Sequence, residues 1–262
     1  PYRTGASQNV AQDAIENMPT MGRSLSDFTR LSPQFVSDPE VSGTFSAGGR
    51  NNRYNNIQID GAVNNDVFGL SDNGTPGGQT ATTPISLDAV QEFQIVLAPY
   101  DVRHGGFTGG GVNVITKTGT NDFHGSAYFY GRNENFVGNG PSDYEFGKFS
   151  DTTFGASLGG PLVKDKLFFF VSAETSKYDQ PADYFVDGSG SSSDLGGLDE
   201  VQAVYDKLMN DYGYDPGSYG DVSNVNESLK IFARLDWNIN ASNRLTLRHN
   251  YVDAERTTFT RT

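Results

Sequence analysis

The chain has 262 residues, with 32 acidic against 19 basic side chains, a formal net charge of −13 and no cysteine. The acidic balance argues against a nucleic-acid partner, whose phosphates require a basic face, and the lack of cysteine excludes disulfide scaffolds and thiolate metal sites. The 31 glycines, 18 phenylalanines and 13 tyrosines, on a background of 35% hydrophobic residues, favour a β-rich chain with many turns.

No apolar run is long enough for a membrane helix. The longest, Leu167 to Val171, is far short of the ~20 residues that such a helix needs. Any membrane role would therefore use strands, which span a bilayer with ~9–11 alternating residues. The three histidines lie far apart and show no ligand spacing, so the sequence predicts neither a metal site nor a cofactor.

The first 120 residues mix short helical and strand patterns. A short helix is predicted within Ile15 to Leu31, where Ser24 or Ser26 can cap it and Leu25, Phe28 and Leu31 recur on one face.

An asparagine-rich stretch follows this helix. Residues Tyr54 to Asp60 alternate weakly and predict a strand that ends in an Asp60-Gly61 turn. Residues 70–83 have the composition of a loop.

A second helix-and-strand unit then follows. A helical turn is predicted at Leu87 to Val90, a strand at Phe93 to Leu97, and a further strand at Val112 to Thr116 behind five closely spaced glycines. Together these pieces predict a small mixed α/β domain.

The second half of the chain alternates with period two. In residues 228–239, Leu229, Ile231, Leu235, Trp237 and Ile239 fall on one side, opposite Lys230, Arg234 and Asp236, with Phe232 as the exception. Strands are predicted near 122–132, 152–159, 167–178, 228–239 and 244–254.

The links between these strands alternate in length. Residues 160–166 and 240–243 form short links, whereas 133–151 and 179–227 form long ones. Short and long links at alternate ends are typical of outer-membrane β-barrels, in which the long loops are extracellular.

The longer link is strongly acidic. Residues 179–226 carry ten acids against one base, Lys207, and a helix over 198–212 is predicted to stop at Gly213. We interpret the loop as a solvated, self-repelling surface, with capture of a divalent cation or ligand as the alternative.

Several phrases resemble the TonB-dependent outer-membrane receptors. In the first half these are YNNIQIDGAV, PISLDAVQEFQIVLAP and HGGFTGGGVNVITKTGT. MPTMGRSLSDFTRLSP and TGTNDFHGSAYFYGRNENF are closer to the Oar-like subgroup. The resemblance covers nearly all of residues 1–137 and, more loosely, the hairpin 152–178.

This resemblance implies an α+β plug domain, residues 1–121, followed by the first antiparallel transmembrane β-barrel strands, residues 122–262. Such barrels have ~22 strands and an occluded lumen. The five strands predicted here cannot close, so the chain is expected to be a fragment of a longer protein.

The resemblance also implies a function and partners. A TonB-dependent transport receptor takes up a large or scarce ligand when an inner-membrane TonB-type complex pulls on an N-terminal segment, which is not in this chain. The location is the outer membrane of a Gram-negative bacterium, and the partners are outer-membrane lipid, the TonB-type complex and a surface lipoprotein. No nucleic acid is expected.

Site residues follow from the same resemblance. In the family, charged plug residues pair with barrel carboxylates, which assigns a plug–barrel lock to Arg50 and Arg53. The plug motif comprises Asp60, Gly61, Gly105, Gly106, Gly109, Gly110 and Gly111, and the glycines are expected to let the backbone pack against the barrel wall. The expected ligand contacts are Asn65, Phe68, Tyr100, Asp101 and His104.

Two other classes of function compete with energised transport. Catalysis is not expected, because GGFTGGGVNV lacks the Gly-Lys-Ser/Thr of a phosphate loop and no nucleophile or carboxylate pair is fixed by the pattern. The alternative to transport is an adhesive or structural outer-membrane barrel with surface-binding acidic loops.

Overall fold

A computed structural model gives the fold and describes residues 6–18, 20, 23–37, 45–71, 73–97, 108–138, 148–181, 197–217 and 223–257. The chain divides into two compact units. The first comprises Pro1–Phe129, Thr153–Ser176 and Ser228–Glu255, and the second comprises Tyr130–Thr152, Lys177–Glu227 and Arg256–Thr262. Within the described ranges no helix is both long and apolar enough to cross a membrane.

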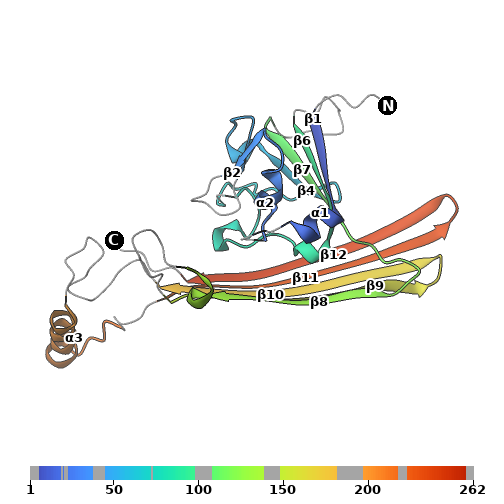
Figure 1. The fold of residues 1–262 in the computed structure, drawn as a ribbon. Coiled ribbons are helices and arrows are strands. Elements are labelled where there is room, and N and C mark those ends of the chain that lie inside the picture. The colour runs from blue at the N-terminus through green and yellow to red at the C-terminus, as the bar shows by residue number, and fades with distance from the viewer. Residues whose placement is uncertain are drawn as a thin grey trace. The chain divides into compact units, whose positions relative to one another are not determined.

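The first unit begins with a small domain built on a mixed sheet (Figure 1). Its strands lie in the order β1-β6-β7-β4-β5, with bounds β1 Ala6–Ala11, β4 Asn56–Ile59, β5 Ala62–Val63, β6 Val90–Leu97 and β7 Gly110–Thr116. Strand β4 runs parallel to β7, and the other neighbours are antiparallel. Burial alternates along β7, so one face of this sheet carries the core.

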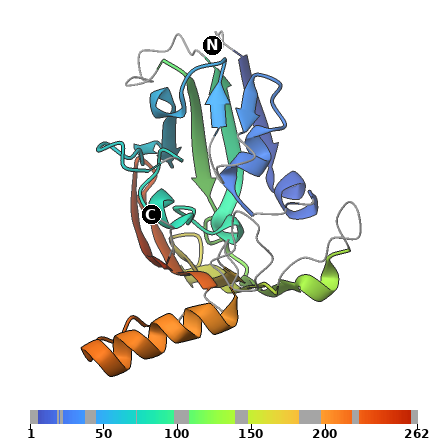
Figure 2. The ribbon, with the colours of Figure 1, turned by 90° about the vertical axis from the view of Figure 1, so that its left-hand side faces the viewer.

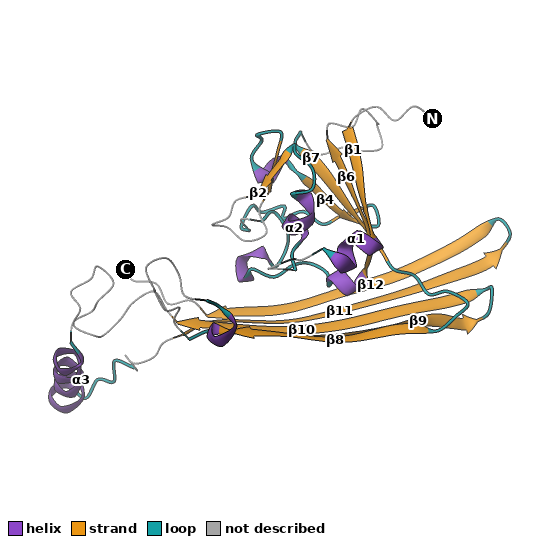
Figure 3. Cartoon of the chain, viewed as in Figure 1, coloured by secondary structure: helices purple, strands orange, loops and turns teal. Residues whose placement is uncertain are grey.

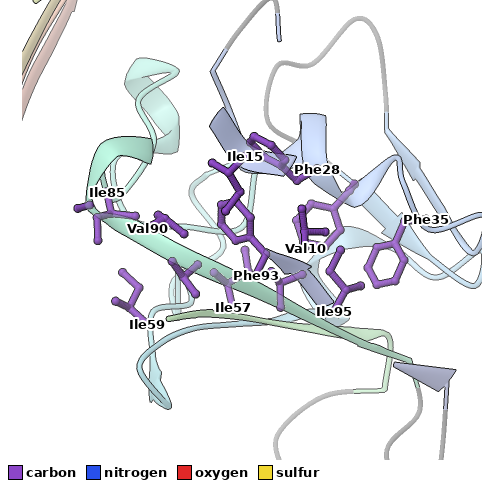
Figure 4. Packing of buried hydrophobic residues seen from close by; sticks show 14 of the residues in the cluster. Val10, Ile15, Phe28, Phe35, Ile57, Ile59, Ile85, Val90, Phe93 and Ile95 are labelled. Atoms are coloured by element: carbon purple, nitrogen blue, oxygen red, sulfur yellow. The ribbon is translucent and has the colours of Figure 1, made fainter. Parts of the chain in front are cut away.

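Two short helices cover that face (Figure 2). Helix α1 spans Gln12–Asn17 and α2 spans Leu25–Thr29, followed by a two-stranded sheet of β2 Phe35–Ser37 and β3 Phe45–Ala47. The Phe28 ring lies 5.0 Å from that of Phe93, and both side chains are almost fully buried (Figure 4). This packing explains why α2 forms where the sequence predicts a helix, although Leu31, expected on the same face, is exposed.

Three 3-10 turns complete this domain: η1 Asn52–Tyr54, η2 Gly78–Thr80 and η3 Leu87–Ala89. The Asp-Gly turn also forms as predicted. Asp60 and Gly61 both have positive φ, +47° and +81°, the backbone that a two-residue hairpin between β4 and β5 requires.

Five long strands follow the domain and lie in the order β12-β11-β10-β9-β8 (Figure 3). Their bounds are β8 His124–Asn133, β9 Ser150–Val163, β10 Leu167–Pro181, β11 Ser223–Asn240 and β12 Asn243–Thr257. Short turns join β9 to β10 and β11 to β12 at the same end of the sheet.

The two faces of these strands differ as the alternation predicts. Polar Glu174, Lys230 and Asp236 are at most 8% exposed, whereas apolar Ile231 and Trp237 are each 40% exposed. The apolar side chains therefore do not line a dry interior between two sheets. Phe232, the exception in the pattern, is buried on the polar face.

The structure also corrects some boundaries. Strand β9 continues to Val163, so the predicted link 160–166 shrinks to a turn at 164–166, in which Asp165 has a φ of +62°. The Gly160-Pro161 pair does not end the strand as predicted. Gly160 lies within β9 and makes room for the neighbouring Phe123 ring, which a Cβ at this position would overlap. Strands β1, β2 and β3 were not predicted, because they are short and depend on pairing with β6 or with each other.

The second unit contains the strand ends opposite the two short turns, η4 Glu134–Phe136 and helix α3 Leu198–Tyr212. Gly213 ends α3 in the left-handed conformation, with its amide bonded to the Met209 carbonyl, as the sequence predicts. Ion pairs join Lys177 to Glu227 at 2.5 Å and Arg132 to Asp151 at 2.8 Å. Residues 139–147, 182–196 and 218–222 of the two long loops lie outside the described residues.

Candidate functional site: the interface between the N-terminal domain and the strands

Asp60, at the β4–β5 turn, is fixed by the neighbouring strand β7. Its carboxylate accepts hydrogen bonds from the Thr116 amide at 2.9 Å and the Thr116 hydroxyl at 2.8 Å. This contact follows from topology, because the parallel strands β4 and β7 end side by side. The acidic group is therefore presented at the edge of the domain in one orientation.

Two arginines from the long strands meet this carboxylate. Arg248 of β12 lies 2.9 Å from Asp60 Oδ2 and also donates to the Ile59 carbonyl, and Arg234 of β11 lies 3.5 Å from the same carboxylate oxygen. Arg234 additionally donates to the Thr116 hydroxyl at 2.8 Å. The IDG turn is thereby attached to two neighbouring strands.

A second acid completes the charge network on the strands. Asp236, 2% exposed, pairs with Arg234 through two hydrogen bonds of 2.8 and 3.2 Å and with Arg244 at 2.9 Å. The Thr246 hydroxyl donates to it at 2.7 Å. Buried charges are tolerated when they are paired and hydrogen-bonded in this way.

Glu174 of β10 is the centre of a separate buried cluster. Its carboxylate accepts hydrogen bonds from Lys230 at 2.9 Å, Tyr128 at 2.7 Å and Ser86 at 3.0 Å. Arg23, from the N-terminal domain, lies 3.9 Å away and stacks over the Tyr128 ring at 4.9 Å. Residues from two other strands and from the domain thus converge on one carboxylate.

A glycine makes the Tyr128 contact possible. Tyr128 lies on β8 and Glu174 on β10, with β9 between them. The tyrosine ring crosses β9 at Gly155, where a Cβ would come within 2.8 Å of Tyr128 Cε1 and closer still to its hydroxyl. Any larger residue at Gly155 would displace the ring.

One short segment of the domain contacts four of the five long strands. We call residues 83–88 the docking segment. Thr83 accepts a hydrogen bond from Lys230 of β11 at 2.9 Å, and the Pro84 carbonyl accepts one from Asn250 of β12 at 2.7 Å. Ser86 bonds to Glu174 of β10 and to Tyr128 of β8. Asp88 accepts a hydrogen bond from Ser126 of β8 at 2.9 Å. Ser86 also caps η3, so the 3-10 turn holds the segment in shape.

Most of these residues were not identified from the sequence. The alternation in residues 228–239 assigns Lys230, Arg234 and Asp236 only to the polar face of their strand. The available signal was the placement of full charges on a strand face that also carries Phe170 and Phe232, which are buried with ring centroids 6.3 Å apart.

The predicted lock arginines have other neighbours. Arg53 donates to the Gly69 carbonyl at 3.1 Å, and the Arg50 side chain is exposed. Among the described residues, neither forms an ion pair with a carboxylate of β8–β12, so their lock role stays a prediction. The ion pairs found here mostly reverse the expected polarity, with Asp60 on the domain and arginines on the strands.

The expected ligand contacts are only partly described. Asn65 accepts a hydrogen bond from the Ile57 amide at 2.8 Å, which fixes the loop that follows β5. Phe68 is 83% exposed. Tyr100, Asp101 and His104 lie outside the described residues, as do Gly105 and Gly106 of the plug motif.

Gly109 and Gly110 of that motif pack inside the domain, whereas Gly61 is exposed. A Cβ on Gly110 would overlap the Phe35 ring and lie 2.7 Å from Ala47, and one on Gly109 would lie 3.1 Å from the Tyr54 carbonyl. Gly109 and Gly110 therefore allow β7 to approach β3 and η1, instead of the long strands as expected. Within the described ranges, no group of three or more His, Asp or Glu side chains could hold a metal ion.

Comparison with known proteins relates the chain to outer-membrane receptors. Residues 115–211 match the family model described as an outer membrane beta barrel domain. The TonB-dependent transporter Oar of Myxococcus xanthus is 34% identical over 147 residues, which is 50% of this chain and 13% of Oar. The probable TonB-dependent siderophore receptor PirA of Acinetobacter baumannii is 28% identical over 176 residues, 61% of this chain and 21% of PirA.

Solved structures share the fold. The siderophore receptor PirA from Acinetobacter baumannii superposes with a TM-score of 0.63 at 19% identity, over 97% of this chain and 32% of that one. The outer membrane transporter YddB from Escherichia coli gives a TM-score of 0.67 at 15% identity, over 95% and 33%. The chain thus spans about a third of these receptor structures, and its alignments cover 13% and 21% of the curated relatives.

Proposed function

We propose that this chain, a relative of the TonB-dependent outer-membrane receptors that include Oar, is the plug domain and the first barrel strands of an energised transport receptor. Residues 1–121 form the plug and residues 122–262 begin the barrel wall. The observation that carries the proposal is the docking segment, which fastens the N-terminal domain to the buried polar face of the strands while their other face is apolar and exposed.

The two faces of the strands fit this placement physically. A barrel wall needs apolar side chains toward lipid and polar ones toward the lumen, alternating along each strand. Leu229, Ile231, Trp237 and Ile239 supply the first set, and Glu174, Lys230 and Asp236 the second. Five strands do not close a barrel, and a plugged barrel of the transporter type has ~22.

The connections set the orientation. We place the short turns at 164–166 and 241–242 in the periplasm. The long links between β8 and β9 and between β10 and β11, which are shorter than the predicted 133–151 and 179–227 because the strands extend into them, lie outside the cell. The protein then resides in the outer membrane of a Gram-negative bacterium, in contact with its lipid.

The proposed activity is uptake of a large or scarce ligand through the plugged barrel. Force from a TonB-type complex, applied through a segment ahead of residue 1, would rearrange the plug, and no covalent chemistry is required. A surface lipoprotein is a further proposed partner. The names of the relatives, a transporter and a receptor, favour transport over catalysis and over the adhesive alternative.

Ligand contact is proposed for the loop after β5 and for the residues Tyr100, Asp101 and His104. Phe68 presents its ring to solvent from a loop that the Asp66 carboxylate holds by accepting from the Phe68 and Ser71 amides at 3.0 and 2.6 Å. Arg50 and Arg53 are proposed to pair with carboxylates of barrel strands beyond this chain.

The experiment is a binding measurement on the full-length protein. We expect it to fractionate with the outer membrane and, when purified in detergent, to bind the isolated periplasmic domain of TonB. A form that lacks the segment ahead of residue 1 is the control and should not bind. Recovery of the full-length protein in the soluble fraction, or equal TonB binding by both forms, would refute the proposal.

A further inference from the structure

Helix α3 lies in the long link between β10 and β11 (Figure 1). It has 15 residues, and the amide of its C-cap Gly213 bonds back to the last turn. A hydrogen bond of 2.7 Å from the Gln202 amide to the Asp206 carboxylate, one turn apart, supports it further. Among the residues of α3 whose exposure the structure describes, none is buried. The helix is therefore formed by local interactions and contributes no side chain to a described core.

One face of α3 is apolar, and we call it the seam. Coiled-coil contacts recur at alternating spacings of three and four residues, and four apolar side chains of α3 do the same: Val201, Tyr205, Leu208 and Tyr212. Tyr212 is 70% exposed, and Val204 and Met209, which flank the seam, are 60% and 40% exposed. Tyrosine and methionine are enriched at protein interfaces. A seam of this kind fits packing against another helix.

Acidic side chains border the seam on both sides. With 3.6 residues per turn, Asp199 and Asp206 lie on one side of the seam and Glu200 and Asp211 on the other, and Lys207 is the single base in the helix sequence. All four acids are exposed.

These charges distinguish between possible occupants of the seam. A second copy of α3 would set acids against acids. Helices that lie on membranes carry Lys and Arg on their polar face, so a lipid surface does not match either. A helix whose own apolar seam is bordered by Lys and Arg matches α3 in both shape and charge.

We infer that α3 is a docking helix for a partner polypeptide that presents a basic amphipathic helix. The seam supplies the apolar contact and the bordering acids supply the charge match. The inference rests on the proposed function for its location, since the proposed orientation places α3 outside the cell. It gives the receptor an extracellular partner of defined chemistry.

The test uses the full-length receptor in a non-ionic detergent and two synthetic coiled-coil peptides. The basic peptide carries Ile and Leu at its seam and Lys beside them, and the acidic peptide has Glu in place of those Lys. Fluorescence anisotropy of the labelled peptides measures binding at low and high salt. We expect the basic peptide to bind about tenfold or more tightly than the acidic one, and its affinity to fall as salt screens the charges.

Variants of α3 locate the binding. Leu208→Gln removes an apolar side chain from the seam and keeps a good helix former, so the affinity for the basic peptide should fall about tenfold or more. Ala203→Gln is the matched control, because it introduces the same side chain at an exposed position on the opposite face. It should bind as the unchanged receptor does. Tyr212→Gln is a second seam variant and should also weaken binding, which guards against a local loss of helix at one position.

Equal affinities for the two peptides, or equal affinities of the Leu208→Gln and Ala203→Gln receptors, would overturn the inference. Binding of neither peptide, as when other loops of the receptor cover α3, would overturn it as well. Binding of the periplasmic domain of TonB is measured on the same preparations. A receptor that binds TonB but neither peptide lacks the inferred partner site and keeps the proposed function, whereas loss of TonB binding by the unchanged receptor removes the proposed function itself.

Discussion

Replacing Glu174 by glutamine should loosen the attachment of the N-terminal domain to the strands. Glutamine retains an acceptor for Tyr128 and Ser86 but leaves the Lys230 ammonium, which is 8% exposed, with only the Thr83 hydroxyl at 2.9 Å. Removing one partner of a buried ion pair costs about 3 kcal/mol or more, because the other charge stays buried without compensation.

The assay is pulse proteolysis of the full-length receptor in detergent over a urea gradient. With a urea dependence of about 2 kcal/mol per molar for a domain of this size, a loss of 3 kcal/mol lowers the midpoint of N-terminal domain cleavage by about 1.5 M. The double variant Glu174→Gln with Lys230→Met should recover part of this loss, since it removes the stranded charge.

The chain supplies a matched control in a second Glu–Lys pair between β10 and β11. Lys177 and Glu227 lie 2.5 Å apart, but both side chains are 56% exposed. Glu227→Gln should therefore cost less than about 1 kcal/mol. Equal midpoint shifts for Glu174→Gln and Glu227→Gln, or strict additivity in the double variant, would refute the role assigned to burial.

Two further predictions concern the N-terminal domain. Gly110→Ala should destabilise it by about 1–3 kcal/mol, because the new methyl group overlaps the Phe35 ring. Gly138→Ala is the control and should leave stability unchanged, because Gly138 lies in open space. Thermal unfolding followed by circular dichroism compares the two variants. Backbone amides that donate to Asp66, the Ser71 amide with the largest effect, hold the pKa of that carboxyl below its usual 3.8. The ionised Asp66 therefore stabilises this loop above pH 3.8, and the stabilisation is lost as the pH falls through the lowered pKa. Hydrogen exchange of the Ser71 amide should accelerate over that acid range, and Asp66→Asn should remove the pH dependence.

Local features of this chain were predictable because their causes are local. The Asp60-Gly61 turn and the Gly213 helix stop each depend on a backbone conformation that those residues favour. The alternation in β11 identified which face carries Lys230 and which carries Trp237, since adjacent strand residues point to opposite faces.

The interface was not predictable for the opposite reason. Ser86 meets Glu174, 88 positions away, only because the docking segment crosses the sheet at one register. No pattern in either segment sets that register. The expectation that arginines on the domain meet carboxylates on the strands came from family resemblance. Arg23 and Glu174 have that polarity, whereas Asp60 opposite Arg234 and Arg248 has the reverse.

The polar character of this interface bears on how the proposed transport could work. The docking segment holds the strands through hydrogen bonds, and Asp60 adds ion pairs to Arg234 and Arg248. Glu174 and Asp60 each bind more than one partner. Water can replace such contacts one at a time in a hydrated lumen, so a domain attached in this way can be partly displaced by force and return to the same register. The N-terminal core is different, because Phe28, Phe93 and Ile95 are at most 2% exposed and separating them exposes apolar surface. Force applied to β1 would therefore act on an edge strand, and displacing β1 and α1 would remove Val10 and Ile15 from that core while the docking segment and the Asp60 contacts stay in place.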